Sequence, residues 1–150
     1  MKVLIGFDHR GHEAASHLAD RLRAHGHESG AHGPQPGETC DYPEIAAYVG
    51  RAVVAGEADV GVLIDASGVG MAIAANKVLG VRAASVHDEI TAELSKAHTD
   101  ANVICLSADL LGHRLMEKII ELYLQTTFEG GRHQRRIDKI TEIERTHGDT

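Results

Sequence analysis

Short apolar runs alternate with amphipathic stretches along the whole chain. The clearest run, residues 60–64, is uninterrupted and apolar, which is typical of a strand covered on both faces. Similar but weaker runs predict four more strands, over residues 3–7, 28–32, 81–86 and 102–106. Apolar residues at helical spacing predict helices over residues 11–26, 41–53, 69–77, 89–98, 110–128 and 132–145. This alternation indicates an α/β protein with a parallel sheet between helices.

The alternation continues without a repeat, a low-complexity tract or a linker, so the 150 residues are expected to form one domain. Hydrophobic residues make up 43% and charged residues 25%, as in ordinary soluble proteins. The formal net charge of -7 argues against nucleic acid or an anionic membrane as the main partner, and 3% aromatic residues are too few for a base-stacking platform. No apolar run approaches the ~20 residues of a membrane span.

The cysteines and histidines indicate which cellular compartment to expect and whether a metal is expected. Cys40 and Cys105 are far apart and form no Cys-x-x-Cys pair, which argues against a disulfide framework or a cysteine zinc site and fits a reducing cytosol. Residues 1–11 reach acid and histidine too early for a signal peptide, so a cytoplasmic protein is expected. The 11 histidines include no His-Glu-x-x-His or comparable pattern, so no metal is expected.

The loop after the central strand, residues 65–70 (DASGVG), is the first candidate site. Its glycines resemble the start of a dinucleotide fingerprint, but the third small residue would fall at Ile73, and no P-loop is present. NAD and ATP are therefore disfavoured, and no cofactor is expected. The loop precedes a helix whose free N–H groups favour an anion, including one formed during catalysis. Asp65 would then be a base for a proton next to a carbonyl; alternatively, Asp65 or Ser67 caps the helix.

Two further positions carry candidate chemistry. Arg132 and Arg136 share one face of the last predicted helix, an arrangement that suits a phosphate monoester. The alternative is a solvated basic turn that pairs with Glu129 or Asp138. His98 stands at a helix end just before a strand, where it could transfer protons near neutral pH or simply favour the helix dipole.

Several motifs follow one another along nearly the whole chain: residues 6–9 (GFDH), 41–43 (DYP), 67–70 (SGVG), 73–77 (IAANK), 98–102 (HTDAN) and 129–133 (EGGRH). In this order and spacing they resemble the ribose-5-phosphate isomerase B family, which also contains the allose-6-phosphate and galactose-6-phosphate isomerases. The resemblance implies a Rossmann-like three-layer α/β/α sandwich with a five-stranded parallel sheet. It also implies metal-free interconversion of an aldose and a ketose phosphate by a homodimer, or a dimer of dimers, with shared active sites. A C-terminal helix, about residues 132–146, would pack on a partner subunit.

The resemblance also assigns roles to residues, some of which would reach in from the partner subunit. His98 would assist ring opening, and the Ser67 hydroxyl with the loop backbone would hold the enediolate. The residues expected to bind the substrate are Asp8, His9, Tyr42, Ala66, Gly68, Val69, Gly70, Thr99, Arg132 and Arg136. The expected reaction converts D-ribose 5-phosphate to D-ribulose 5-phosphate.

Five positions depart from the family pattern. Asp65 stands where one branch has a cysteine base, and Met71 stands where a second branch has a glutamate base. Ala66 replaces a glycine, Thr99 a common asparagine, and Asp109 an arginine that often helps to bind phosphate. We hypothesise that Asp65 is the base, since a carboxylate can take a proton from carbon next to a carbonyl. The alternatives are isomerisation of allose 6-phosphate, galactose 6-phosphate or a tetrulose phosphate, and a sugar-phosphate-binding protein that has lost catalysis.

Overall fold

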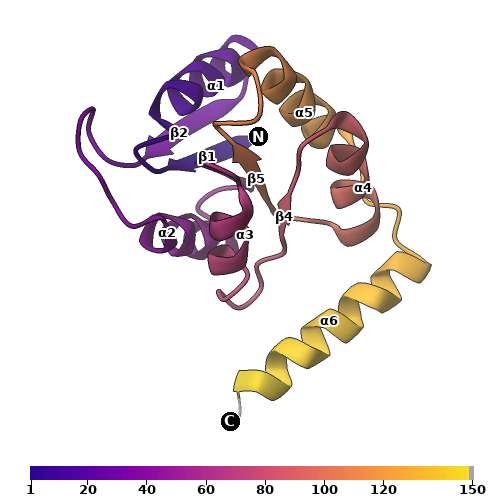
Figure 1. Ribbon diagram of the computed structural model, residues 1–150. Helices are drawn as coiled ribbons and strands as arrows, with labels where there is room; N and C mark the ends of the chain where they lie inside the picture. The colour runs from indigo at the N-terminus through magenta and orange to yellow at the C-terminus, as the bar shows by residue number, and fades with distance from the viewer. Residues whose placement is uncertain (149–150) are drawn as a thin grey trace.

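The computed structural model describes residues 1–148. Its centre is a sheet of five parallel strands in the order β2-β1-β3-β5-β4 (Figure 1). The strands are β1 (Lys2–Phe7), β2 (Glu28–His32), β3 (Val60–Asp65), β4 (Ala83–Ser85) and β5 (Val103–Ser107). The helices are α1 (His12–Ala24), α2 (Tyr42–Val54), α3 (Val69–Ala75), α4 (Glu89–Thr99), α5 (His113–Gln125) and α6 (Arg132–Gly148).

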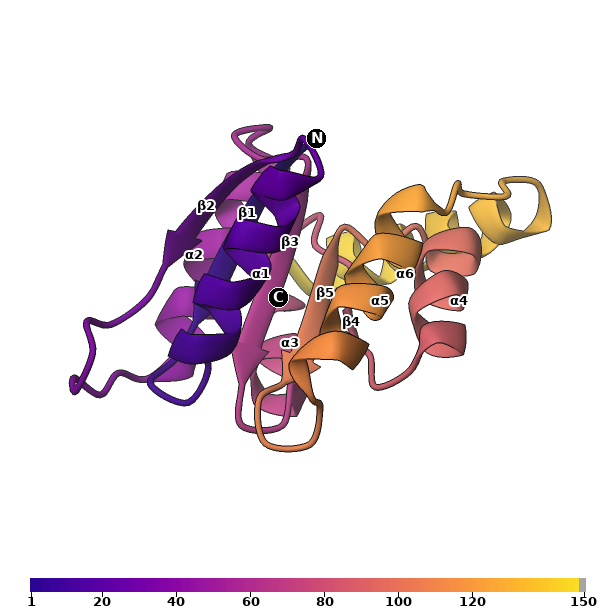
Figure 2. The same ribbon diagram turned by 90° about the horizontal axis from the view of Figure 1, so that it is seen from above.

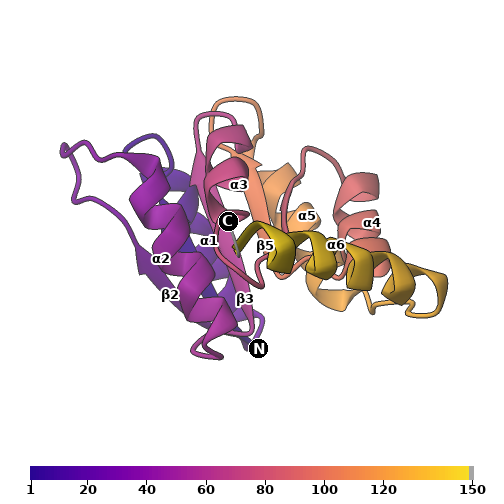
Figure 3. The ribbon, with the colours of Figure 1, turned by 90° about the horizontal axis from the view of Figure 1, so that it is seen from below.

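Helices cover both faces of the sheet, because side chains alternate across each strand and leave an apolar surface on either side. On one face, Val3 and Ile5 of β1 pack in a core with apolar residues of α1, α4 and α5. On the other face, Leu63 of β3 and Val103 of β5 pack with α2 and α3. Figure 2 shows α1, α4 and α5 on one side of the sheet, and Figure 3 shows α2 and α3 on the other. The predicted three-layer sandwich is confirmed.

The central strand β3 fixes where a site can form. All six of its residues are buried, as its apolar sequence predicts. Its neighbours are β1 and β5, with Val62 between Ile5 and Ile104 in the register. Because the three strands are parallel, the loops that follow them meet at one edge of the sheet, here called the carboxyl edge. The opposite edge, where the strands begin, is called the amino edge.

The predicted bounds of two elements, β4 and α5, were wrong, and α5 also ends at Gln125 instead of residue 128. Hydrogen bonds explain why each of these elements begins later than predicted. β4 pairs only over Ala83–Ser85, because the Arg82 N–H donates to the Asn102 side chain at 2.8 Å instead of continuing the ladder. α5 begins at His113, not at residue 110, because a turn precedes it in which the Leu110 N–H donates to the Ser107 hydroxyl at 3.0 Å. The existence and order of every predicted element are confirmed.

Helix α6 lies beyond the β4 side of the sheet and outside both layers (Figures 1 and 3). The Glu129 N–H just before it donates to the Ala97 carbonyl, and Glu144 near its end accepts from the Gly80 N–H at 2.9 Å. Ile140 and Ile143 of this helix are 49% and 57% exposed. The helix therefore carries apolar side chains that its own chain leaves open to solvent. Like the other described helices, it lacks the length and apolar character needed to cross a membrane.

Candidate active site

Three acidic residues follow neighbouring strands at the carboxyl edge: Asp8 after β1, Asp65 at the end of β3 and Asp109 after β5. Asp8 and Asp65 are only 5% and 4% exposed, whereas Asp109 is exposed. The Asp8 N–H donates to the Ile64 carbonyl at 3.1 Å, which joins the first two loops. Buried carboxylates need hydrogen-bond donors, so the donors that these two find determine what the site can do.

The Asp65 carboxylate is held by the backbone that follows it. Its Oδ1 accepts from the Ser67 N–H at 3.1 Å and from the Gly68 N–H, and its Oδ2 accepts from the Met71 N–H at 3.2 Å. The capping arrangement considered from the sequence is therefore present. A carboxylate has room for about four hydrogen bonds, so Oδ2, which accepts one, retains a lone pair. That oxygen is the atom through which Asp65 could also accept a proton.

The anion-binding loop expected at residues 66–70 needs a correction, because most of its donors already have acceptors. The N–H groups of Ser67 and Gly68 donate to Asp65, and the Val69 N–H donates to the Ser67 hydroxyl oxygen at 3.2 Å. An amide cannot serve Asp65 and an enediolate at once. The N–H groups of Ala66 and Gly70, which have no acceptor among residues 1–148, and the Ser67 hydroxyl hydrogen are the donors that remain for a ligand.

Asp8 repeats this arrangement at the start of α1. Its Oδ1 accepts from the Arg10 N–H at 2.8 Å and from the Gly11 N–H at 3.2 Å. His9, which the sequence assigned to substrate binding, is exposed between them. The buried carboxylate therefore shapes the loop that presents His9 and Arg10 at the carboxyl edge.

Tyr42 lies against the Asp65 loop. A Cβ atom on Gly70 would come within 2.7 Å of the Tyr42 Cζ, so only glycine permits this approach of the ring. Cys40 lies close to the Asp8–His9 loop, and burial raises the pKa of its thiol, with the Asp8 carboxylate raising it further. Cys40 is therefore a protonated thiol at neutral pH and not a thiolate base.

Two side chains at this edge were missed by the sequence reasoning. Arg10 pairs with Asp109, with its Nε at 3.2 Å and its Nη2 at 2.6 Å from Oδ1. His87 places its Nε2 3.2 Å from the Ser67 carbonyl, and because a carbonyl only accepts, this nitrogen is the protonated one in that contact. Both residues come soon after a strand, and that position was the available signal.

A second group of predicted residues lies at the amino edge, where α4 ends and α6 begins. The His98 ring stacks on the His133 ring, with centroids 4.2 Å apart and planes 7° from parallel. Glu129 Oε2 lies 3.8 Å from the Nε2 of His98 and 3.3 Å from that of His133. His133 is 4% exposed, whereas Arg132 and Arg136 are exposed.

This histidine pair is better suited to proton transfer than to binding a metal. The ligand atoms of His98, Glu129 and His133 lie within 4.8 Å of one another. An imidazole binds a metal in the plane of its ring, however, and two parallel stacked rings have no such point in common. Burial lowers the pKa of His133, and the nearby charges of His98 and Arg132 lower it further. His133 therefore takes up a proton less readily than an exposed histidine.

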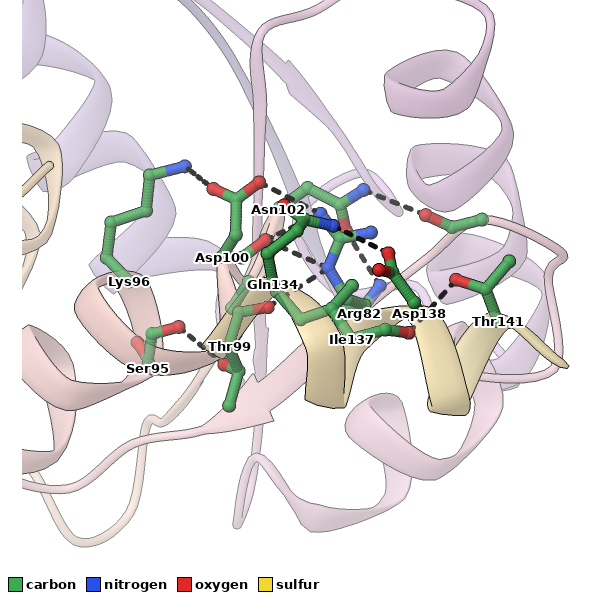
Figure 4. Close-up of polar contacts among 12 residues, drawn as sticks. Arg82, Ser95, Lys96, Thr99, Asp100, Asn102, Gln134, Ile137, Asp138 and Thr141 are labelled. Carbon is green, nitrogen blue, oxygen red and sulfur yellow. Dashed lines mark hydrogen bonds and ion pairs between the residues drawn. The ribbon is translucent and has the colours of Figure 1, made fainter. Parts of the chain in front are cut away.

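A polar cluster fixes the turn that follows His98 (Figure 4). Asp100 has a φ of 43°, a left-handed conformation, and its carboxylate contacts Lys96 at 2.5 Å and Arg82 at 3.2 Å. Arg82 also donates to the carbonyls of Thr99 and Asp100. The Thr99 hydroxyl donates back to the Ser95 carbonyl at 2.5 Å, so its oxygen can accept a hydrogen bond from a substrate but its hydrogen is already engaged.

Within one chain, the predicted site residues form two separate groups. His98 stands just before a strand, as the sequence indicated, and because residues 98–102 precede β5 they lie at the amino edge and not beside Asp65. The carboxyl-edge group comprises Asp8, His9, Tyr42 and the loop of residues 65–70. A cavity of about 220 Å³ between α1 and α5 contains no member of either group.

This fold and this edge define an α/β protein with a ligand site at the ends of its parallel strands. More specifically, the chain belongs to the ribose/galactose isomerase family, whose sequence model matches residues 3–140. Ribose-5-phosphate isomerase B of Escherichia coli (strain K12) is 41% identical over an alignment of 147 residues. The match covers 95% of this chain and 96% of that protein. The family that the motifs predicted is thereby confirmed.

Solved structures agree with this assignment. The Clostridium thermocellum ribose-5-phosphate isomerase B matches with a TM-score of 0.96 and 40% identity, covering 98% of this chain and 99% of that one. The Mycoplasma genitalium ribose-5-phosphate isomerase B, solved with bound ribulose-5-phosphate, matches with a TM-score of 0.91 and 40% identity over 96% of each chain.

Proposed function

We propose that this protein interconverts a phosphorylated aldose and ketose, with D-ribose 5-phosphate and D-ribulose 5-phosphate as the pair, in cytoplasmic pentose phosphate metabolism. The observation that carries the proposal is agreement over nearly the whole chain with relatives of that name, at 41% identity to the Escherichia coli protein. The Mycoplasma relative, described with ribulose-5-phosphate bound, supports the same substrate. The reaction needs a base, donors for an enediolate and cations for a phosphate, and the two edges supply these groups.

At the carboxyl edge, Asp65 moves the proton. Removal of the C2 proton from the open-chain aldose gives an enediolate, and return of the proton to C1, with transfer of the O2 hydroxyl proton to O1, gives the ketose. One base must therefore reach both carbons. The Asp65 Oδ2, which accepts a single hydrogen bond, is the proposed base. The Ser67 hydroxyl and the Gly70 N–H donate to the enediolate oxygen. Asp8, His9 and Tyr42 border the sugar.

The amino edge completes the site of a partner chain. His98 assists ring opening, and Arg132 and Arg136 bind the phosphate. Because these residues lie at the opposite edge from Asp65 in their own chain, they reach a carboxyl edge only on a second copy. We therefore propose that the single domain of residues 1–150 forms a homodimer, or a dimer of dimers, in which α6 packs on the partner. The exposed isoleucines of α6 support this, because they offer an apolar surface to a second chain.

The activity is tested by incubating the purified protein with ribose 5-phosphate in deuterated water and following the sugars by NMR. We expect ribulose 5-phosphate to form and deuterium to enter the sugar, since an enediolate exchanges its proton with solvent. Allose 6-phosphate, galactose 6-phosphate and erythrulose 4-phosphate are assayed beside it. Turnover of one of these without turnover of ribose 5-phosphate would reassign the substrate.

The role of Asp65 is tested by Asp65→Asn, which preserves the shape of the side chain and one acceptor oxygen but removes the base. We expect kcat to fall by about 10³-fold with little change in KM, the signature of a group that acts in the transition state. Asp88→Asn is the matched control, because Asp88 also accepts a backbone N–H, that of Thr91 at 2.7 Å. Turnover of Asp65→Asn within about tenfold of the parent would leave Asp65 only its capping role.

A second candidate function is sugar-phosphate binding without catalysis. The three backbone donors to Asp65 favour it, because a carboxylate used only as a cap leaves the loop without a base. Binding of ribose 5-phosphate without exchange of its C2 hydrogen for deuterium would identify this second function.

A further inference from the structure

Arg10 and Asp109 form an ion pair across the end of the central strand. Both donors lie on one side of the Arg10 guanidinium, with Nε at 3.2 Å and Nη2 at 2.6 Å from Asp109 Oδ1. Arg10 belongs to the loop after β1, and Asp109 to the loop after β5. Since β1 and β5 flank β3, the pair spans the edge at which the Asp65 loop begins.

Both ends of this bridge are anchored to the two buried acids. The Arg10 N–H donates to Asp8 Oδ1 at 2.8 Å. On the other side, the Ala108 N–H donates to the Asp65 carbonyl at 2.8 Å, and the Asp109 N–H donates to the Ala66 carbonyl at 3.2 Å. The backbone positions of Arg10 and Asp109 are therefore fixed relative to the proposed base.

The pair itself is exposed, with 54% of the Arg10 side chain and 41% of the Asp109 side chain accessible. Ion pairs of this kind contribute little to folding stability. Their main effect is on side-chain orientation. An arginine side chain that is held at one side of its guanidinium points its remaining donors in a defined direction. The Nη1 donors of Arg10 have no partner among the described residues, and a guanidinium with free donors is a good ligand for a phosphate oxygen.

The local charge requires such a cation. Asp8, Asp65 and Asp109 bring three carboxyl groups to the same edge, and a sugar phosphate that approaches them is itself an anion. Among residues 1–148, Arg10 is the cationic side chain that contacts one of these carboxylates. Arg10 offsets the repulsion between these carboxylates and a phosphate, in addition to Arg132 and Arg136, which the proposed function brings from a partner chain.

We propose that Arg10 binds the phosphate group of the substrate at the carboxyl edge and that Asp109 is its positioning residue. Asp109 thus faces a side chain of its own protein and not a sugar hydroxyl. This inference rests on the proposed function for the identity of the phosphate-bearing ligand.

The direct test is titration of inorganic phosphate into the protein, followed by NMR or calorimetry, together with steady-state kinetics on ribose 5-phosphate. For Arg10→Gln we expect phosphate binding to weaken and KM to rise by about tenfold or more, with kcat within about threefold of the parent. Arg23→Gln is the control, because Arg23 forms a similarly exposed pair with Asp20 at 2.8 Å on α1. Unchanged phosphate binding and KM in Arg10→Gln would overturn the assignment.

The role of Asp109 is tested in two backgrounds. Asp109→Ala is expected to raise KM in the parent and to have no further effect when Arg10 is already Gln, while Asp109→Glu restores most of the affinity. An equal effect of Asp109→Ala in both backgrounds would show that it does not act through Arg10. The two proposals can fail separately. If the parent binds phosphate through Arg10 but does not isomerise ribose 5-phosphate, only the proposed function is wrong. If the parent isomerises ribose 5-phosphate and Arg10→Gln changes neither phosphate binding nor KM, only the role of Arg10 is wrong.

Discussion

The two edges of the sheet hold their candidate functional groups in opposite ways. At the carboxyl edge, Asp8 and Asp65 are buried, and backbone N–H groups of their own loops fix both carboxylates. At the amino edge, His98 and His133 touch face to face, and the arginines beside them are exposed on a helix that lies outside the two layers (Figure 1). Backbone hydrogen bonds fix the acidic groups at the carboxyl edge, whereas contacts between side chains fix the histidines at the amino edge.

This difference indicates which edge depends on a second chain. The loops that carry Asp8 and Asp65 are short and lie between buried strands and helices, so local hydrogen bonds are enough to define them. The position of α6 rests on few contacts with its own chain, and its isoleucines are exposed. We therefore expect carboxyl-edge substitutions to change folding stability as well as catalysis, and amino-edge substitutions to change assembly and catalysis with little effect on stability.

The largest stability effect is expected for Asp65→Ala. The substitution leaves three N–H groups, those of Ser67, Gly68 and Met71, without their acceptor. We expect the free energy of unfolding, measured with urea, to fall by about 3–5 kcal/mol. His98→Ala at the other edge should change it by less than about 1 kcal/mol. Equal losses in the two variants would contradict the contrast between the edges.

Substitutions in α6 should weaken the association of chains with little effect on the folding of each chain. A variant with both Ile140→Asp and Ile143→Asp is expected to sediment as a folded monomer, because two charges replace an apolar contact and weaken association by about 100-fold or more. Ile90→Asp, at a residue 70% exposed in α4, serves as the control for an added surface charge. A stable dimer of the double variant would show that α6 is not the interface.

The turn at Gly68 offers a smaller test of the carboxyl edge. Gly68 has a φ of 77°, and an added Cβ would lie 3.1 Å from the Leu106 carbonyl carbon and 3.2 Å from the Cys105 oxygen. Gly26 has a similar φ of 81° but open space around it. By denaturation we expect Gly26→Ala to cost about 1 kcal/mol and Gly68→Ala about 2–3 kcal/mol. The same cost at both sites would mean that β5 does not constrain the loop.

The elements of this fold are readable from the sequence because each signal is local. The apolar run of β3 and the helical spacing of Ile45, Val49 and Val53 in α2 need no distant partner to be recognised. The family motifs add the positions at which a ligand is expected. The late start of β4 was not predictable, because the strand begins only after Arg82, whose N–H bonds to a side chain twenty residues away.

The chemistry of the site was harder to predict because it depends on contacts between distant residues. Arg10 and Asp109 are 99 residues apart in sequence, and no pattern links them. The donors to Asp65 are local, but whether the Gly68 and Met71 N–H groups face the carboxylate or a ligand depends on the path of the loop. The position of His98 before a parallel strand places it at the amino edge, but its stacking on His133 depends on the path of the chain into α6.

The smallest expected effect is a pH dependence of folding stability that arises at the amino edge. Burial and the charges of His98, Arg132 and Arg136 hold the pKa of His133 below its ordinary value, against an opposing effect of Glu129. The unfolded chain therefore binds this proton first, so stability is expected to fall as pH drops below about 6.5, towards the lower folded-state pKa. His133→Asn should flatten that part of a pH series of melting curves. A slope unchanged by the substitution would assign the dependence to another group.

The central claim, that each site combines the carboxyl edge of one chain with the amino edge of another, is tested most directly by mixing two inactive variants. Asp65→Asn and His98→Asn are unfolded together and refolded, and turnover of ribose 5-phosphate is compared with that of each variant alone. Half of randomly formed dimers then contain one intact site of two, so we predict recovery of about one quarter of the parent activity. No activity above that of the separate variants would show that each site is built within a single chain.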